Sequence, residues 1–287
     1  MSIAEILVVV DGAPGGEAAV DAALHLGRKF HARVELLHVE MDVDSAMPVV
    51  GEGISGAAVE QMMQSLQAEA EARQAEAKRL FQVHVVAKKM PVVEPDAEPV
   101  AGKFAVSYRQ VAGRQAAAVM RRARLADFTV LGGPGREGGM PATLDAVLFE
   151  SGRPLLMVPA APAGDIGATV AVAWDRSREA VCAVQAALPI LRRAKSVIVM
   201  TAREADDDVE PSELCRYLAA HGITARTWAF SPKSGSMGEA LLREAAKADA
   251  DLLVMGGYGH SRLRELVLGG ATRYILAKAT MPVFMMH

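Results

Sequence analysis

The sequence predicts an α/β protein built from two tandem doubly wound domains, each with a Rossmann-like parallel sheet. Short apolar runs alternate with segments of helical periodicity, which is typical of βαβ units. The plan of the first half recurs after a link rich in proline, alanine and glycine at Pro159–Gly167. A chain of 287 residues with 51% hydrophobic and 23% charged residues has the composition and length for two folded domains. We therefore expect domains at 1–160 and 166–287.

The two halves open in the same way. In the first, an apolar strand at Ile6–Val10 ends in Asp11-Gly12, and a helix and a second strand follow at Gly16–Phe30 and Val34–Val39. The corresponding strand, helix and strand of the second half are expected at Thr169–Ala173, Ser177–Leu191 and Ser196–Met200. Right-handed crossovers between parallel strands place ligands at the carboxyl ends of the strands.

The halves also close in the same way. Each ends in a short apolar strand preceded by proline, and these strands are expected at Leu155–Val158 and Val283–Met286. Proline at the first residue of a strand costs little, because its missing N–H lies outside the ladder. Such short apolar strands are edge strands that need to be covered.

The first half is longer than the second. Asp11 to Gly132 spans 121 positions, whereas Asp175 to Gly256 spans 81. Most of the excess lies at 41–102, where an apolar stripe predicts a helix over Ala57–Phe81. A strand is expected after this segment, at Lys103–Tyr108. We interpret this insertion as a surface elaboration, with a dedicated partner site as the alternative. The stripe consists of Val59, Met62, Met63, Leu66, Ala70, Ala77 and Leu80.

Composition excludes several classes of partner. A net charge of −3 and a pI near 6.2 provide no basic surface for nucleic acid or an anionic membrane. The N-terminus lacks the basic region of a signal peptide, and no run approaches the ~20 apolar residues of a membrane span. Cys182 and Cys215 form neither a metal-binding spacing nor a disulfide framework, so a cytoplasmic location is expected. The basic residues Arg121, Arg122 and Arg124 are interpreted as complementing the dipole at the end of a helix.

Catalytic patterns are absent from the sequence, so we expect a protein that is not an enzyme. It contains no G-x-S-x-G nucleophile elbow, no H-E-x-x-H zinc motif and no clustered set of acidic and histidine ligands. No metal site is predicted.

A glycine-rich segment follows the apolar strand Asp251–Met255 and precedes a predicted helix at Ala271–Lys278. Its frame is G-x2-G-x9-G, formed by Gly256, Gly259 and Gly269. Glycine permits close approach of a ligand to the backbone, and a helix start presents unpaired N–H groups to an anion. The segment therefore predicts a site for phosphate.

This frame resembles the nucleotide-binding signature of the universal stress protein family, whose fold is adenine nucleotide alpha hydrolase-like. The family pattern continues with serine or threonine, whereas Gly269 is followed here by Gly270, and Thr272 is the nearest hydroxyl. The resemblance implies a stress or signalling protein without strong catalysis, which binds an adenine nucleotide, chiefly ATP, with or without Mg²⁺. The alternatives are an interaction scaffold that binds no nucleotide and a slow nucleotide hydrolase.

The resemblance also implies the site residues, all in the second half. Asp175 takes the acidic position that contacts the nucleoside, and Thr201 lines the same pocket. The resemblance puts Ala173, Trp174 and Met255 beside the base, and Gly256, Gly259, Gly269, Gly270 and Ala271 along the ribose and phosphates. His260 could donate to a phosphate or be a solvated loop histidine.

The first half keeps Asp11, Gly132 and Gly135, but its counterpart of Gly269 is expected to be Asp145, whose carboxylate would repel phosphate. We therefore expect one nucleotide per chain. Family members commonly dimerise through the final strand. The two halves are thus expected to form an intrachain pseudo-dimer through their final strands, and a homodimer of whole chains stays open.

Overall fold

The computed structural model describes residues 2–12, 15–41, 56–133, 142–160, 164–202, 212–232, 236–257 and 270–287. The elements of the first half are β1 (Glu5–Val9), α1 (Gly16–Phe30), β2 (Arg33–Glu40), α3 (Gly56–Phe81), the π-helical η1 (Gln82–Val86), β3 (Ala105–Ala112), α4 (Gln115–Ala123), β4 (Phe128–Gly132), α5 (Ala142–Asp145), the π-helical η2 (Ala146–Glu150) and β5 (Leu155–Val158). Those of the second half are β6 (Thr169–Ala173), α6 (Arg178–Leu191), β7 (Ser196–Ala202), α7 (Ser212–Ala220), β8 (Ala225–Phe230), α8 (Met237–Lys247), β9 (Leu252–Gly256), α9 (Gly270–Lys278) and β10 (Val283–Met286).

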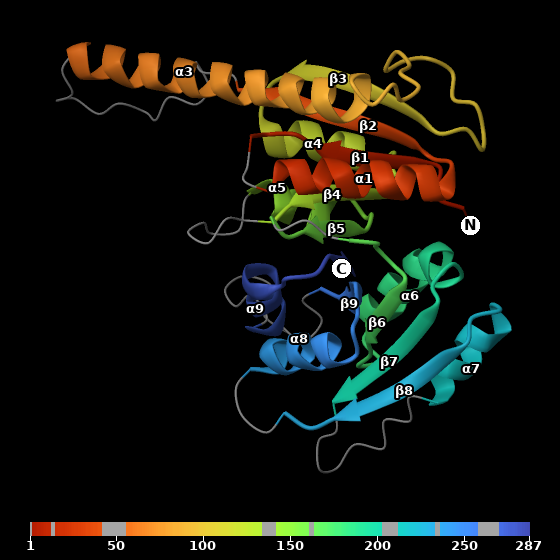
Figure 1. Ribbon diagram of the computed structural model, residues 1–287. Helices are drawn as coiled ribbons and strands as arrows, with labels where there is room; N and C mark the ends of the chain where they lie inside the picture. The colour runs from red at the N-terminus through yellow and green to blue at the C-terminus, as the bar shows by residue number, and fades with distance from the viewer. Residues whose placement is uncertain are drawn as a thin grey trace.

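All ten of these strands belong to one sheet, in the order β3-β2-β1-β4-β5-β10-β9-β6-β7-β8 (Figure 1). Every pair is parallel except β5 and β10, which run antiparallel. The strand order therefore reverses between β1 and β4 in one half and between β6 and β9 in the other. Such a reversal is where doubly wound sheets bind ligands. The predicted α/β fold class is confirmed.

The two final strands meet in the middle of this sheet. Val283, Phe284 and Met285 lie opposite Met157, Leu156 and Leu155 respectively. Each strand thereby covers the edge that the other would expose. Their pairing turns two five-stranded sheets into one.

Helices cover both faces of the sheet. The apolar residues of α1, α6 and α7 pack with one set of strand side chains, and those of α4, α8 and α9 pack with the alternate set on the opposite face. Each of the two core layers contains residues from both halves. The Phe128 and Phe284 rings, for example, are 5.8 Å apart across the junction.

The extra length of the first half is mainly a longer crossover helix. The 26-residue α3 connects β2 to β3, a position that the 9-residue α7 occupies between β7 and β8. Only Ala77 and Leu80 of α3 are buried, and its first turns project beyond the sheet (Figure 1). The predicted helix is present, but β3 extends to Ala112, four residues beyond the predicted end of the strand.

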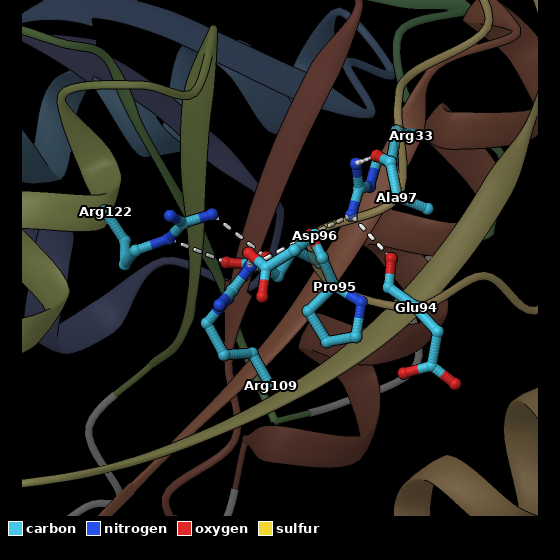
Figure 2. A network of polar contacts seen from close by, with 8 residues as sticks. Arg33, Glu94, Pro95, Asp96, Ala97, Arg109 and Arg122 are labelled. Atoms are coloured by element: carbon cyan, nitrogen blue, oxygen red, sulfur yellow. Dashed lines mark hydrogen bonds and ion pairs between the residues drawn. The ribbon is translucent and has the colours of Figure 1, made fainter.

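Glu35, in β2, binds Arg122, one of the three basic residues that the sequence assigned to a helix end. Its buried carboxylate accepts from Arg109 Nε at 2.9 Å and from Arg122 Nε at 2.9 Å (Figure 2). Arg109 also binds Asp96 Oδ1 at 2.7 Å, so the pair holds the loop before β3 against the sheet. The interpretation of Arg122 as a helix-dipole complement alone was therefore incomplete, because it is an ion-pair partner of a buried strand residue.

Candidate functional site

The candidate site lies where the strand order of the second half reverses. Strands β6 and β9 are neighbours, with Val172 opposite Val254, so Trp174 and Asp175 leave the sheet beside Gly256. Helix α9 connects two parallel strands, β9 and β10. Its N-terminus at Gly270 therefore returns to the same carboxyl edge of the sheet. Gly259, His260 and Gly269 lie outside the described residues.

The expected base-contacting residues face opposite layers. Ala173 and Met255 pack into the layer of α8 and α9, whereas Trp174 packs into the layer of α6 and α7. Thr201 alternates with Met200 and so faces the same side as Trp174. The structure does not bring the side chains of Trp174 and Met255 together, so contact of both with one base stays a prediction.

The buried hydroxyl of Thr201 lies at the end of β7. The residue is 3% exposed, and its Oγ1 has no hydrogen-bond partner among the residues that the structure describes. The neighbouring Trp174 N donates to Met200 O at 2.9 Å, which joins the end of β7 to the turn after β6. A buried hydroxyl without a partner costs roughly 1–3 kcal/mol, which marks this edge as a place where a polar group is expected.

Asp175 is held by the turn that starts α6. Its Oδ1 accepts from Ser177 N at 3.0 Å, and Ser177 Oγ in turn caps the helix by accepting from Ala180 N at 3.1 Å. Arg176 between them adopts a left-handed backbone with φ of 63°. These local bonds keep the carboxylate exposed at the edge of the sheet.

Asp11 occupies the same place in the first half but has a different environment. Its Oδ2 accepts from Gln115 Nε2, at the start of α4, at 3.0 Å. The equivalent acidic residue is thus bonded to a side chain from another helix. The two halves therefore differ at their acidic positions as well as in their glycine segments.

A hollow of about 200 Å³ lies beside Trp174, between α6 and α7. Its walls are mainly apolar, and Val181 and Tyr217, 38% and 39% exposed, border it. The remaining lining residues are Val184, Gln185, Glu213 and Leu214. Sequence reasoning did not identify the α7 residues, because apolar side chains at helical spacing are typical of any packed helix.

Gly256 is required by helix packing. A Cβ at this position would lie 2.6 Å from Ala180 N and 2.8 Å from Glu179 C, at the start of α6. Gly132, its counterpart, would meet Gly15 C at 2.6 Å in the same way. The shared glycine therefore permits close helix approach in both halves, whereas the sequence interpretation assigned it only to ligand approach. At Gly270, by contrast, an added Cβ would have no atom of a described residue within 4 Å.

This difference gives a test of the two glycines. We expect Gly256→Ala to lower the free energy of unfolding by about 1–3 kcal/mol, because the new methyl group meets backbone atoms. Gly270→Ala should change it by less than about 1 kcal/mol. Urea denaturation of both variants measures the difference. Equal stabilities would contradict the packing role of Gly256.

The expected counterpart of Gly269 in the first half was wrong. Thirteen positions separate the start of α5 at Ala142 from β5 at Leu155, and thirteen separate the start of α9 at Gly270 from β10 at Val283. Ala142 therefore matches Gly270, and Asp145 lies one turn inside its helix. Burial raises the pKa of the Asp145 carboxyl. The residue that matches Gly269 is Pro141, which has no N–H to offer a phosphate.

Both halves match the Universal stress protein family, over residues 3–159 and 168–287. The chain belongs to the universal stress protein family. A universal stress protein of Archaeoglobus fulgidus has a similar crystal structure, with a TM-score of 0.67 at 16% identity over 98% of this chain and 97% of that one. A functionally unknown protein of Pseudomonas aeruginosa PAO1 gives a TM-score of 0.55 at 17% identity, over 99% and 92% of the two chains. At these identities, the structural similarities show the fold.

Two further universal stress proteins are similar over parts of the chain. Universal stress protein Slr1230 of Synechocystis is 45% identical over 49 residues, so the match spans 17% of this chain and 17% of that relative's length. A universal stress protein crystallised in complex with cAMP is 15% identical, with a TM-score of 0.32 over 56% of this chain and all of that one. In the present protein, none of the helices that the structure describes is long and apolar enough to cross a membrane. Its described residues contain no group of three or more acidic, histidine or cysteine side chains that could hold a metal ion.

Proposed function

We propose that this universal stress protein binds an adenine nucleotide, chiefly ATP, in its second half and acts in a stress or signalling response without strong catalysis. The observation that carries the proposal is the carboxyl edge of β6 and β9. There an exposed carboxylate, an aromatic hollow and the start of a helix lie around the point where the strand order reverses.

In this proposal the nucleotide lies across the edge of the sheet. The base packs on Trp174 and the adjoining hollow, while Asp175 accepts from a ribose hydroxyl or an exocyclic amine. The phosphates approach the N–H groups of Gly270 and Ala271, where no described residue would crowd a Cβ added at Gly270. Gly259, His260 and Gly269 complete the phosphate side, and Mg²⁺ would be carried by the phosphates.

The first half is proposed to bind no nucleotide. The start of α5 is preceded by Pro141 where the second half has Gly269, and Asp11 is already bonded to Gln115. We infer that the halves act as an intrachain pseudo-dimer, which the pairing of β5 with β10 supports. One of its two sites is then functional.

Isothermal titration with ATP, and with cAMP as a second probe, tests this proposal. We expect one site per chain, with affinity reduced at least tenfold in Asp175→Ala because the ribose loses its acceptor. Asp11→Ala is the matched control and should bind as the wild type does. Gly269→Asp should abolish binding, since a carboxylate at ~4 Å from a phosphate oxygen costs about 4 kcal/mol at an effective dielectric near 20. Two equivalent sites, or undiminished binding in both second-half variants, would refute the assignment.

A second experiment separates a binding protein from a hydrolase. ATP incubated with the protein and Mg²⁺ should stay intact for many hours, as measured by chromatography of the nucleotides. Turnover that disappears in Asp175→Ala would instead establish an enzyme.

A further inference from the structure

A second hollow, of about 410 Å³, lies on the outer side of α1, against the segment that follows η1. We refer to it as the α1 hollow. Leu24 and Met90, both buried, line its base, and three cationic side chains line it further out: Arg28 and Lys29 of α1, and Lys88. Its lining residues all belong to the first half, whereas the candidate nucleotide site belongs to the second half.

Neither α1 cation forms an ion pair with a described carboxylate, although the charges of Asp251 and Asp165 act on Lys29 from a greater distance. Lys29 Nζ donates to the carbonyl oxygens of Ile166 and Gly167, at 2.9 and 3.4 Å. No described carboxylate lies within 4 Å of the Lys29 amine or the Arg28 guanidinium, and the guanidinium lies 5.8 Å from the centre of the Phe104 ring. Burial lowers the pKa of Lys29, because removal from water disfavours the charged form of its amine. The last turn of a helix suits a cation, but the helix dipole supplies only a partial negative charge.

The acidic residues around the hollow are already engaged. Asp21 lines it, with Oδ1 2.7 Å from His84 Nδ1 and 3.6 Å from Lys88 Nζ. His25 also lines it, 3.8 Å from an Asp165 oxygen. The lining of the hollow therefore contains three cationic side chains and one carboxylate, in a chain whose net charge is −3. A bound anion would neutralise Arg28 and Lys29 through charge-assisted hydrogen bonds, which are stronger than neutral ones.

We propose that the α1 hollow binds a small organic anion. Its phosphate or carboxylate group is held by Arg28, Lys29 and Lys88, and its apolar part lies on Leu24 and Met90. Because Lys29 also holds the Ile166 and Gly167 carbonyls, the bound anion sits beside the segment that joins the two halves. This site does not depend on the proposed nucleotide function.

Calorimetry with three probes tests the proposal at low ionic strength: phenyl phosphate, inorganic phosphate and phenol. We expect phenyl phosphate to bind more tightly than inorganic phosphate, because the ring covers Leu24 and Met90, and phenol not to bind. The double variant Arg28→Gln with Lys29→Gln should lose at least tenfold in affinity for phenyl phosphate. Arg121→Gln, which removes an exposed cation of α4, is the matched control and should bind as the wild type does.

The proposal would be overturned if the wild type bound neither phenyl phosphate nor inorganic phosphate. It would also be overturned if the double variant bound phenyl phosphate as tightly as the wild type does. Equal losses in the double variant and in Arg121→Gln would overturn it too, because they would indicate a nonspecific charge effect. Circular dichroism checks the fold of each variant. If the double variant does not fold, Lys88→Gln replaces it, since the exposed Lys88 side chain contributes little to packing, and a loss of severalfold is then expected. ATP titration of the same variants should be unchanged, which keeps this site distinct from the nucleotide site.

Discussion

We expect a charged residue at the centre of the joined sheet to destabilise the whole chain. Val283→Glu or Met285→Lys places a charge on β10 at a fully buried position opposite β5. No described cation or carboxylate faces these positions within the strand pair, so the charge is desolvated without a partner. We expect a loss of more than about 4 kcal/mol in unfolding free energy for each variant. Urea denaturation followed by circular dichroism measures it.

The matched control is Leu125→Glu, because Leu125 is 70% exposed. Its unfolding free energy should change by no more than about 0.5 kcal/mol. Both core layers contain residues from both halves. In the β10 variants, the two halves should therefore unfold together in one transition. A folded Val283→Glu, Met285→Lys double variant with an unchanged thermal midpoint would contradict the role of this junction.

Glu35→Gln is expected to have the second largest effect on stability. The Glu35 side chain is 6% exposed and binds the guanidinium groups of Arg109 and Arg122, both labelled in Figure 2. These two cations repel each other once the carboxylate is removed. Removing one partner of a buried ion pair costs about 3–5 kcal/mol. The thermal midpoint should therefore fall by about 6–20 °C, since each kcal/mol corresponds to about 2–4 °C in a chain of this size.

Glu76→Gln makes the same chemical change in an exposed pair. Glu76 and Arg79 are 2.7 Å apart, but their side chains are 38% and 47% exposed. The expected loss is below about 1 kcal/mol, because solvent screens the pair. Similar losses in Glu35→Gln and Glu76→Gln would show that burial does not strengthen the Glu35 cluster.

The order of the elements could be predicted from the sequence. The helix at Gly16–Phe30 and the strands at Leu155–Val158 and Val283–Met286 are present as predicted. These elements depend on hydropathy at spacings of two to four residues and on local breakers such as proline and glycine. The sequence also predicts the internal repeat and the resemblance to the family. It places Asp175 directly after a strand, at the carboxyl edge of the predicted sheet.

Only the tertiary structure decided which residues meet. It placed Trp174 and Met255 on opposite layers, paired Glu35 with Arg122, and showed that Ala180 approaches Gly256 too closely for a side chain. It also showed that Ala142, three residues before Asp145, matches the start of α9. Each of these facts depends on the distance between elements far apart in the chain. Local periodicity determines that a strand or helix forms and which of its faces is apolar, while the packing of neighbouring elements determines what that face contacts.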